Sequence, residues 1–300
     1  MRRTAFAVVA CFLSVLMGSV AWGEIKIGML AERGKEAAAF EWAELQSYLT
    51  EHVGQKVTVV PLKYSEFMAF VREEPAAIIF TNPWFFVRCQ VRYHARALVT
   101  AKYEGSGAVS GGVIFAKKGS GIASLNDLRD RALMCPKFSS PDGWLFQKGE
   151  IEGCGLKPER DLKVLVESGK ESDEEVVYAV REGKADAGTV RTNLLENMER
   201  EGKIRVDEFV ILNQVQHNDF PAACSTPLYP EWPVAALGRT AAEDAARIKQ
   251  ALLSIPEGHP ALKRAGRIEK FVEALDYFTM ENLCRFLKVA PFTERHRQAQ

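Results

Sequence analysis

The sequence predicts an α/β fold with two lobes, each built on a mostly parallel sheet flanked by helices. Strand-like and helix-like segments alternate along residues 25–103 and again along residues 113–212. Such alternation is typical of parallel sheets that are covered by helices on both faces. Two irregular stretches, residues 104–112 and 213–233, separate the series. A ligand site is therefore expected where the lobes face each other, at the carboxyl ends of the strands.

The first residues have the layout of a secretory signal peptide. Arg2 and Arg3 precede an apolar run from Ala5 to Met17, and small residues follow up to Gly23. The apolar core is shorter than a membrane-spanning helix requires. We therefore expect residues 1–23 to be cleaved and the mature chain to reside in the periplasm. An uncleaved N-terminal anchor is the alternative.

Composition and charge indicate a globular protein without a nucleic-acid surface. The 300 residues are 47% hydrophobic and 26% charged, which suffices for one large domain or two lobes. There are 39 basic and 39 acidic residues, so the formal net charge is zero. Any anion-binding site must therefore depend on local groups rather than on a global field.

The first series begins with an apolar strand over residues 25–30. Ala38, Trp42 and Leu45 recur at helical spacing, which predicts a helix over residues 35–51. Asn82 followed by Pro83 has the pattern of a helix start, because proline suits the first helical position. The remaining elements of this series are expected as strands at 57–61, 77–80 and 98–103 and as helices at 65–72 and 82–93.

The second series is predicted in the same way. Ser124 is expected to cap a short helix over residues 125–129. After residue 233 we expect a strand, a helix that Thr240 and Glu243 cap together, further helix up to Pro291, and a disordered tail after Phe292. The other elements are strands at 113–116, 132–135, 162–166, 185–190, 209–212 and 234–237, and helices at 143–153, 173–181, 192–201 and 240–254.

The segment of residues 183–196, GKADAGTVRTNLLE, is the most informative part of the chain. A strand ends at Arg191, and Thr192 opens the next amphipathic pattern. Helix N-termini carry unpaired N–H groups and a positive dipole end, so a cation and a hydroxyl at this junction suit an anion. The alternative is an ordinary turn with a solvated arginine.

Polar and aromatic side chains follow the predicted strands at several points. In the expected topology these strand ends meet between the lobes, so the side chains converge on one site. Trp84 and Trp144 could instead be core aromatics, and Asn82 a simple helix cap. The candidate ligand-binding residues at these strand ends are Arg33, Tyr64, Asn82, Trp84, Ser139, Ser140, Trp144, Arg191 and Thr192.

No metal-binding or catalytic motif accompanies these residues. The five histidines are scattered, and neither H-E-x-x-H nor G-x-S-x-G occurs. We therefore expect no metal, no cofactor and no enzymatic activity. Five cysteines follow residue 23, so pairs Cys135–Cys154 and Cys224–Cys284 are possible; unpaired buried cysteines are the alternative.

Several fragments resemble the periplasmic solute-binding proteins of phosphate, phosphite and phosphonate ABC transporters, which are two-lobed (type 2) binding proteins. They are residues 28–49, residues 80–86 (FTNPWFF), residues 121–128 and residues 177–192. Within that superfamily, the chain is most similar to the sensor input regions of tetrathionate-responsive histidine kinases. The fragments that carry this second likeness are residues 33–36 (RGKE), 188–192 (GTVRT) and 225–233 (STPLYPEWP).

The resemblance implies a monomeric protein that closes around a small oxyanion. It implies one lobe from residues 24–110 and 213–300 and another from residues 111–212, and its last fragment adds Ser225 and Thr226 to the candidate ligand-binding residues. The implied partner is an ABC permease that takes up the ligand. The alternative is a separate sensor kinase in the inner membrane, to which the closed protein would report its ligand.

The chain departs from the phosphonate-binding pattern at three places. Asp173-Glu174 stands where relatives often have a histidine before an acid, and only Ser139 and Ser140 remain of a Ser/Thr-rich turn. A cleft tyrosine is missing near Val109 and Ser110. An extra anion within a few Å of a phosphonate repels it by ~1 kcal/mol in partly wet surroundings. The ligand class therefore stays open between a phosphorus oxyanion and a sulfur oxyanion.

Overall fold

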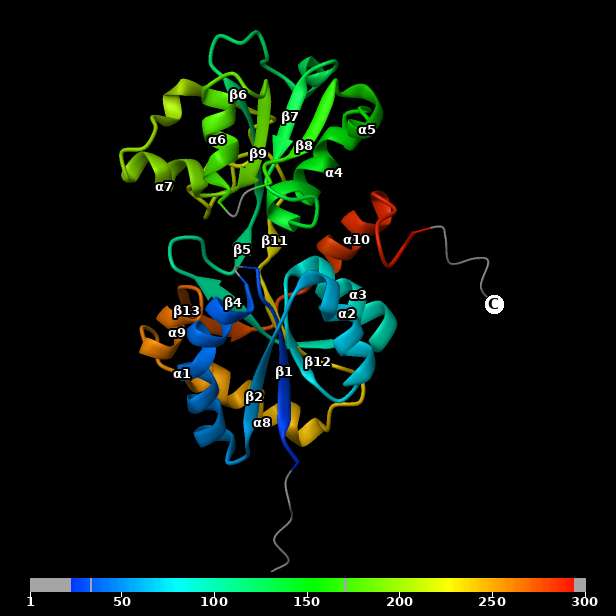
Figure 1. Cartoon of the computed structure of the whole chain (residues 1–300), viewed down its shortest axis with the longest axis vertical. Helices are drawn as coiled ribbons and strands as arrows, with labels where there is room; N and C mark the ends of the chain where they lie inside the picture. The colour runs from blue at the N-terminus through cyan, green and yellow to red at the C-terminus, as the bar shows by residue number, and fades with distance from the viewer. Residues whose placement is uncertain (1–22, 33, 170–171, 294–300) are drawn as a thin grey trace, which may run out of the picture.

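The structure, a computed structural model, describes residues 23–32, 34–169 and 172–293. The chain forms two α/β lobes that lie one above the other in Figure 1 and crosses between them twice. Residues 1–22 of the expected signal peptide, Arg33 and the tail from residue 294 lie outside the described residues. In the described part, no helix has the length and hydropathy to span a membrane.

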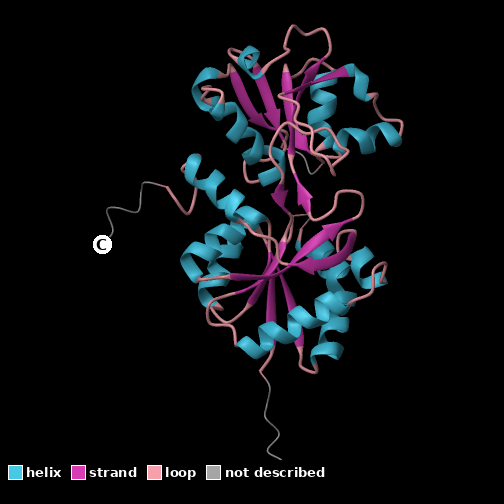
Figure 2. Ribbon diagram, turned by 180° about the vertical axis from the view of Figure 1, so that it is seen from behind, coloured by secondary structure: helices cyan, strands magenta, loops and turns pink. Residues whose placement is uncertain are grey.

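Lobe 1 contains a six-stranded sheet in the order β13-β4-β12-β3-β1-β2. Helices lie on both of its faces (Figures 1 and 2). Its strands are β1 (Ile25–Leu30), β2 (Val57–Leu62), β3 (Ile78–Phe80), β4 (Arg96–Tyr103), β12 (Pro233–Ala236) and β13 (Ile268–Glu273). Its helices are α1 (Lys35–Val53), α2 (Tyr64–Glu73), α3 (Pro83–Tyr93), α8 (Ala242–Ser254), α9 (Pro260–Arg264) and α10 (Phe278–Phe286).

Lobe 2 contains a five-stranded sheet in the order β10-β6-β9-β7-β8. Its strands are β6 (Gly112–Lys117), β7 (Ala132–Cys135), β8 (Val164–Glu167), β9 (Ala187–Arg191) and β10 (Phe209–Leu212). Its α-helices are α4 (Phe146–Gly153), α5 (Pro158–Asp161), α6 (Glu174–Arg181) and α7 (Leu194–Arg200). Short helical turns are η1 (Leu125–Leu128), the π-helical η2 (Pro141–Leu145) and η3 (Val206–Glu208).

Both sheets are mixed rather than mostly parallel. In lobe 1, β1 pairs parallel with β2 and β3, but β12 pairs antiparallel with β3 and β4. The reason is the double crossing: β4 carries the chain out of lobe 1 and β12 brings it back, so the two neighbours run in opposite directions. In lobe 2, β6 enters and β10 leaves, and they also pair antiparallel.

Two short strands form the connection between the lobes. β5 (Val109–Ser110) pairs antiparallel with β11 (Tyr229–Pro230), and both lie between the lobes in Figure 1. Helix α10 packs against α3 of lobe 1 and α4 of lobe 2. The buried cluster that it forms includes Val87 of α3, Phe146 of α4, and Leu283 of α10 itself. The lobes are therefore joined by two strands and by a shared apolar contact.

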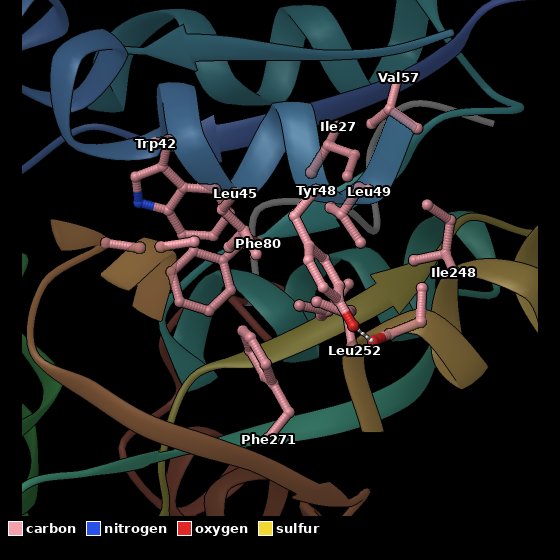
Figure 3. Packing of buried hydrophobic residues seen from close by; sticks show 14 of the residues in the cluster. Ile27, Trp42, Leu45, Tyr48, Leu49, Val57, Phe80, Ile248, Leu252 and Phe271 are labelled. Carbon is pink, nitrogen blue, oxygen red and sulfur yellow. Dashed lines mark hydrogen bonds between the residues drawn. The ribbon is translucent and has the colours of Figure 1, made fainter. Parts of the chain in front are cut away.

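The largest core lies in lobe 1, where α1 covers the sheet (Figure 3). Leu45 and Leu49 are fully buried, and the Trp42 ring lies 4.7 Å from the Phe80 ring, centroid to centroid. The Tyr48 hydroxyl donates to the Ala251 carbonyl at 3.4 Å, so α1 is also tied to α8. The apolar residues that recur at helical spacing in residues 35–51 thus form the buried face of α1.

The C-terminal third differs from the prediction in two ways. Residues 268–273 form strand β13 instead of helix, because they pair antiparallel with β4 and bury Ile268 and Phe271. Thr240 does not cap α8, which begins at Ala242; its Oγ1 donates to the Ala77 carbonyl at 2.9 Å. Tertiary pairing decides both cases over local pattern.

All five cysteines of the described part are free. Cys154 is exposed, and the other four are buried. The possible disulfide pairs are therefore not formed. Burial raises the pKa of the Cys89, Cys135 and Cys284 thiols to about 12 each, so they remain neutral and pack as small apolar groups.

Candidate functional site

Arg191, the last residue of β9, lies among carboxylates from both lobes. Burial would lower its pKa, but the combined attraction of Asp142, Glu231, Asp173 and Glu32 raises it. Asp142 and Asp173 belong to lobe 2, and Glu32 and Glu231 to lobe 1. We call these five residues the interlobe cluster. Arg191 keeps contact with solvent, so its guanidinium can reach a ligand from water.

On the lobe 1 side, Glu32 follows β1 and Tyr64 begins α2. The Tyr64 hydroxyl donates to Glu32 Oε1 at 2.6 Å. Burial by the surrounding protein raises the pKa of Glu32 to about 7, although its side chain keeps some contact with solvent. The Tyr64 hydrogen bond opposes that shift, and the negative charges of Asp142 and Asp173 add to it. Carboxylates of opposite lobes thus act on each other across the space between them.

Asn82 combines a structural and a potential binding role. Its Oδ1 accepts from the Phe85 N–H at 2.9 Å and caps α3, with Pro83 as the first helical residue, as the sequence predicts. The side chain is fully buried, and its Nδ2 has no hydrogen-bond partner in the described part. The amide lies beside the Tyr64 hydroxyl and lowers the pKa of that group, which burial raises far more. The Asn82 amide is therefore a buried donor that lies next to the cluster, beside the Tyr64 hydroxyl.

On the lobe 2 side, the turn after β7 leads into η2. Ser140 Oγ donates to Asp142 Oδ1 at 2.9 Å and accepts from the Gly143 N–H at 3.1 Å. Asp173 stands at the N-terminus of α6, but its carboxylate does not cap that helix. Burial and, to a smaller extent, the charge of Asp142 raise the pKa of Asp173 to about 6, against the opposing charges of Arg191 and Lys137.

Glu231 and Tyr103 complete the surroundings of Arg191 from lobe 1. Glu231 is 7% exposed, and burial together with Asp142 raises its pKa to about 7, whereas Arg191 and a hydrogen bond with Ser110 lower it. Burial, Glu231 and Glu32 raise the pKa of Tyr103 well above its usual value, against the opposing charge of Arg191. Tyr103 is the last residue of β4.

The candidate ligand-binding residues of the sequence do not include Glu32, Tyr103 and Glu231, nor the lobe 2 acids Asp142 and Asp173. Glu32 directly precedes Arg33, and Glu231 lies inside the fragment STPLYPEWP, so both stood next to residues that had been selected. Carboxylates repel anions, so a pattern of anion-binding groups does not indicate them. The signal that could have found Tyr103 is its position at the end of a predicted strand.

The structure places several predicted residues in other roles. The Trp84 Nε1–H donates to the Ala290 carbonyl at 2.7 Å, and Trp144 is 3% exposed in the lobe 2 core. Thr192 does not begin a helix: α7 starts at Leu194 after Asn193 in a left-handed conformation. Ser139 is half-buried in the turn after β7. Arg33, in the turn after β1, lies outside the described residues.

Ser225, Thr226 and Thr192 bond the backbone of the crossing segment. Ser225 Oγ donates to the Leu212 carbonyl at 2.7 Å and accepts from the Ile114 N–H at 2.9 Å. Thr226 Oγ1 accepts from the Gly112 N–H at 3.0 Å, and Thr192 Oγ1 accepts from the Gly111 N–H at 3.3 Å. All three residues are buried, so their hydroxyls hold the connection between the lobes.

A separate pocket of about 750 Å³ lies on the outer side of lobe 1, between α1 and the α8–α9 region. The tyrosine and histidine side chains that line it already contact each other or neighbouring backbone groups. The Tyr48 and His52 rings stack at 3.8 Å, His52 Nδ1 contacts the Tyr48 carbonyl at 2.9 Å, and His259 Nδ1 accepts from the Ala261 N–H. The interlobe cluster, with its crowded charges from both lobes, is the better candidate for a binding site.

Comparison with known families decides the identity of the fold and its class. Residues 27–277 match the family described as ABC transporter, phosphonate, periplasmic substrate-binding protein. The chain belongs to this family. Both lobes and both crossings fall inside the matched range, so the periplasmic phosphonate-binding family accounts for the whole two-lobed architecture and not for one lobe alone.

One relative of this phosphonate-binding family member is a sensor kinase. The tetrathionate sensor histidine kinase TtrS of Salmonella typhimurium is 32% identical over 242 residues, which are 79% of this chain and 40% of that protein. The chain thus spans less than half the length of that relative.

Two solved structures share the fold at low identity. PhnD1 of Prochlorococcus marinus in complex with methylphosphonate has a TM-score of 0.66 at 16% identity, covering 88% of this chain and 98% of that one. A Xanthomonas citri protein bound to ATP has a TM-score of 0.68 at 18% identity, covering 88% and 95%.

Proposed function

We propose that this protein captures a small oxyanion between its lobes and delivers it to an ABC permease in the inner membrane. The observation that carries this proposal is Arg191, a solvent-accessible guanidinium at the end of a strand, facing groups of the opposite lobe. A guanidinium with five N–H donors in a fixed fork suits phosphonate, phosphite, phosphate and sulfur oxyanions. The family supplies the small-anion ligand class and the permease partner.

The residues proposed to contact the ligand come from both lobes. Arg191 supplies the charge, and the Asn82 amide supplies a buried donor beside the Tyr64 hydroxyl. Tyr64, Ser139 and Ser140 lie at the same strand ends, with hydroxyls that can rotate toward a ligand. Arg33 belongs to the proposed set because it follows β1, beside Glu32.

The proposal also covers the export of the protein, its oligomeric state and the motion of its lobes. Residues 1–23 act as a cleaved export signal, and the mature protein is a periplasmic monomer. The lobes move about the crossing segments at residues 109–112 and 224–230, with residues 24–110 and 213–300 as one body and residues 111–212 as the other. The permease recognises the closed, ligand-bound form of the protein.

A sensory role is the second candidate, and the 32% identity to the tetrathionate sensor kinase favours it. In that role, the ligand-closed protein docks on a separate membrane kinase instead of a permease. The genes beside this one separate the two: permease and ATPase genes indicate uptake, whereas a kinase and a response regulator indicate sensing. Under either role, the oxyanion site between the lobes is the same.

The direct test is the variant Arg191→Ala. Oxyanion binding should weaken by ~2–4 kcal/mol, because an anionic ligand loses its charged hydrogen-bond partner. Calorimetry of the mature protein with phosphate, phosphite, methylphosphonate, sulfate, thiosulfate and tetrathionate measures the effect. Arg200→Ala is the matched control, since Arg200 is exposed and bonds Asn197 on α7. Equal affinities in the wild type and Arg191→Ala would place the site elsewhere.

A further inference from the structure

Buried side chains of lobe 2 connect the turn η2 to the end of strand β9. Ser139 and Ser140 directly precede η2, and β9 ends at Arg191. Thr189 of β9 is fully buried, and its Oγ1 donates to the Gly143 carbonyl of η2 at 2.7 Å. Single π-helical turns such as η2 are rare and occur frequently at functional sites. Two groups of candidate ligand contacts are therefore connected inside lobe 2.

Gln147, the second residue of α4, makes another connection between the same two segments. Its Nε2 donates to the Asp142 carbonyl of η2 at 2.6 Å and to the Val190 carbonyl of β9 at 2.8 Å. The side chain is fully buried, and its Oε1 has no hydrogen-bond partner among the described residues. A side-chain amide has two N–H donors. Both donors of Gln147 are thus used, and the two carbonyls alone orient its amide.

Gly112 provides the space that the Gln147 amide occupies. It is the first residue of β6, directly after the crossing, and pairs with Arg191 in the antiparallel β6–β9 ladder. A Cβ atom on Gly112 would lie 2.3 Å from both Cδ and Nε2 of Gln147, and its three nearest atoms would all belong to that side chain. Gly112 does not have a left-handed backbone conformation. The glycine is therefore required for the close approach of the amide to the strand end that carries Arg191.

We propose that Gln147 is a positioning residue of the ligand site. It holds the turn of residues 139–142 and the end of β9 in one arrangement, so that the turn and the Arg191 guanidinium meet an oxyanion together. Groups that are ordered before binding pay less conformational entropy when the ligand arrives. Gln147 is itself fully buried and acts through these groups. The proposal rests on the proposed function, because it requires that Arg191 and the turn contact the ligand.

The first test is Gln147→Met, because methionine has nearly the length of glutamine but no N–H donor. Calorimetry measures binding of inorganic phosphate, methylphosphonate and tetrathionate, and denaturant unfolding measures stability. Affinity for each oxyanion that the wild type binds should fall about 10-fold or more, since the turn and the strand end lose a shared pair of hydrogen bonds.

Thr240→Val is the matched control. Thr240 is a buried residue of lobe 1, and its hydroxyl also donates to a backbone carbonyl, that of Ala77 at 2.9 Å. Both variants should lower the unfolding midpoint, because each removes a buried hydrogen bond to the backbone. Only Gln147→Met should lower oxyanion affinity, which a purely structural role of Gln147 would leave unchanged.

Gly112→Ala tests the same connection without removing a hydrogen-bonding group, and it decides the question if Gln147→Met does not fold. The added methyl group must displace the Gln147 amide, so affinity should fall by about 10-fold. In a Gln147→Ala background, the same methyl group should change affinity by less than about twofold, because the displaced amide is absent. Gly153→Ala is the control, since Gly153 of α4 has open space at its Cβ position and affinity should not change.

Wild-type affinity in a folded Gln147→Met protein would overturn the proposal and leave Gln147 with a structural role. An equal loss from Gly112→Ala in both backgrounds would also overturn it, because the effect would not depend on Gln147. In both cases the wild type still binds an oxyanion, and the proposed function stands. Failure of the wild type to bind any of the oxyanions would instead overturn the proposed function, and the positioning role with it.

Discussion

The crossing segments and the interlobe cluster both lie between the lobes, but their polar side chains differ in whether they bond the backbone. At the crossing, the hydroxyls of Thr192, Ser225 and Thr226 bond backbone groups of neighbouring segments. At the cluster, the Asp173 carboxylate does not cap α6, and the neighbouring Asn82 Nδ2 bonds no backbone group of the described residues. Buried polar groups are normally satisfied. The difference separates the polar groups that maintain the fold from those that are available to a ligand.

The largest expected effect tests the satisfied side of this comparison. Ser225→Ala removes both the donor to the Leu212 carbonyl and the acceptor for the Ile114 N–H in a fully buried position. We expect a loss of ~2–3 kcal/mol in the free energy of unfolding, because two buried backbone groups lose their partner. Denaturant unfolding measures it, and oxyanion affinity of the folded variant should stay as in the wild type.

The control for Ser225→Ala is Ser47→Ala, whose exposed hydroxyl bonds the Ala43 carbonyl within α1. Its stability should change by less than ~0.5 kcal/mol. If Ser225→Ala instead keeps wild-type stability and loses oxyanion affinity, Ser225 belongs to the binding site and the separation drawn above is mistaken.

The second effect concerns charge in the cluster. Burial raises the pKa of Glu231 from 4.5 to about 7, so the folded protein binds a proton there that the unfolded chain releases earlier. The contribution of this group is therefore fully present below about pH 4.5 and is lost as the pH rises through about 7. Glu231→Gln should leave stability unchanged at pH 4.5 and raise it by ~2 kcal/mol at pH 8, since the glutamine carries no charge to bury.

Glu66 provides a control of opposite sign. The Lys63 N–H and the Lys35 ammonium lower its pKa, so Glu66 stabilises the fold above its unfolded pKa and loses that effect as the pH falls. Glu66→Gln should therefore be less stable than the wild type at pH 8 and equal to it at low pH. Thermal unfolding at a series of pH values compares the two variants. A Glu231→Gln protein that is destabilised at pH 8 would mean that Glu231 is a needed partner of Arg191.

The smallest expected effect concerns Asn82, whose side-chain oxygen and nitrogen have different roles. Asn82→Asp keeps an oxygen that accepts from the Phe85 N–H, and a carboxylate suits a helix N-terminus, so α3 should remain capped. The substitution replaces the Nδ2 donor by a further acceptor. We expect oxyanion affinity to fall by about 1–2 kcal/mol, the scale of one hydrogen bond. The unfolding free energy should also fall at neutral pH, because the new carboxyl is buried. Unchanged affinity would assign Asn82 to helix capping alone.

Much of the fold could be predicted because it follows from local pattern. The helical spacing of Trp42, Leu45 and Leu49 corresponds to the buried face of α1, and Asn82 with Pro83 marks the start of α3. The prediction failed for residues 268–273, where pairing with β4 makes a strand, and for Thr240, whose hydroxyl bonds Ala77 across the lobe. A partner distant in sequence decided each of these outcomes.

The site was predicted less completely than the fold. Arg191, Tyr64 and Asn82 were selected from their positions at strand ends, where the structure also places charged and unpaired groups. Trp84, Trp144 and Thr192 were selected by the same rule. Their side chains instead bond the Ala290 carbonyl, lie in the lobe 2 core and bond the crossing segment, in that order. Position at a strand end identifies which residues come near, and not which of their atoms remain unpaired.

The sequence by itself determined that this chain alternates strands and helices in two series, because periodicity and helix-start signals act over a few neighbouring residues. It also determined that Arg191 stands at the end of a strand. Only the tertiary structure decided that four carboxylates from two lobes surround this guanidinium, because Glu32 and Glu231 lie far from it along the chain. Electrostatic coupling depends on distance in space, and the two crossings bring the distant segments together.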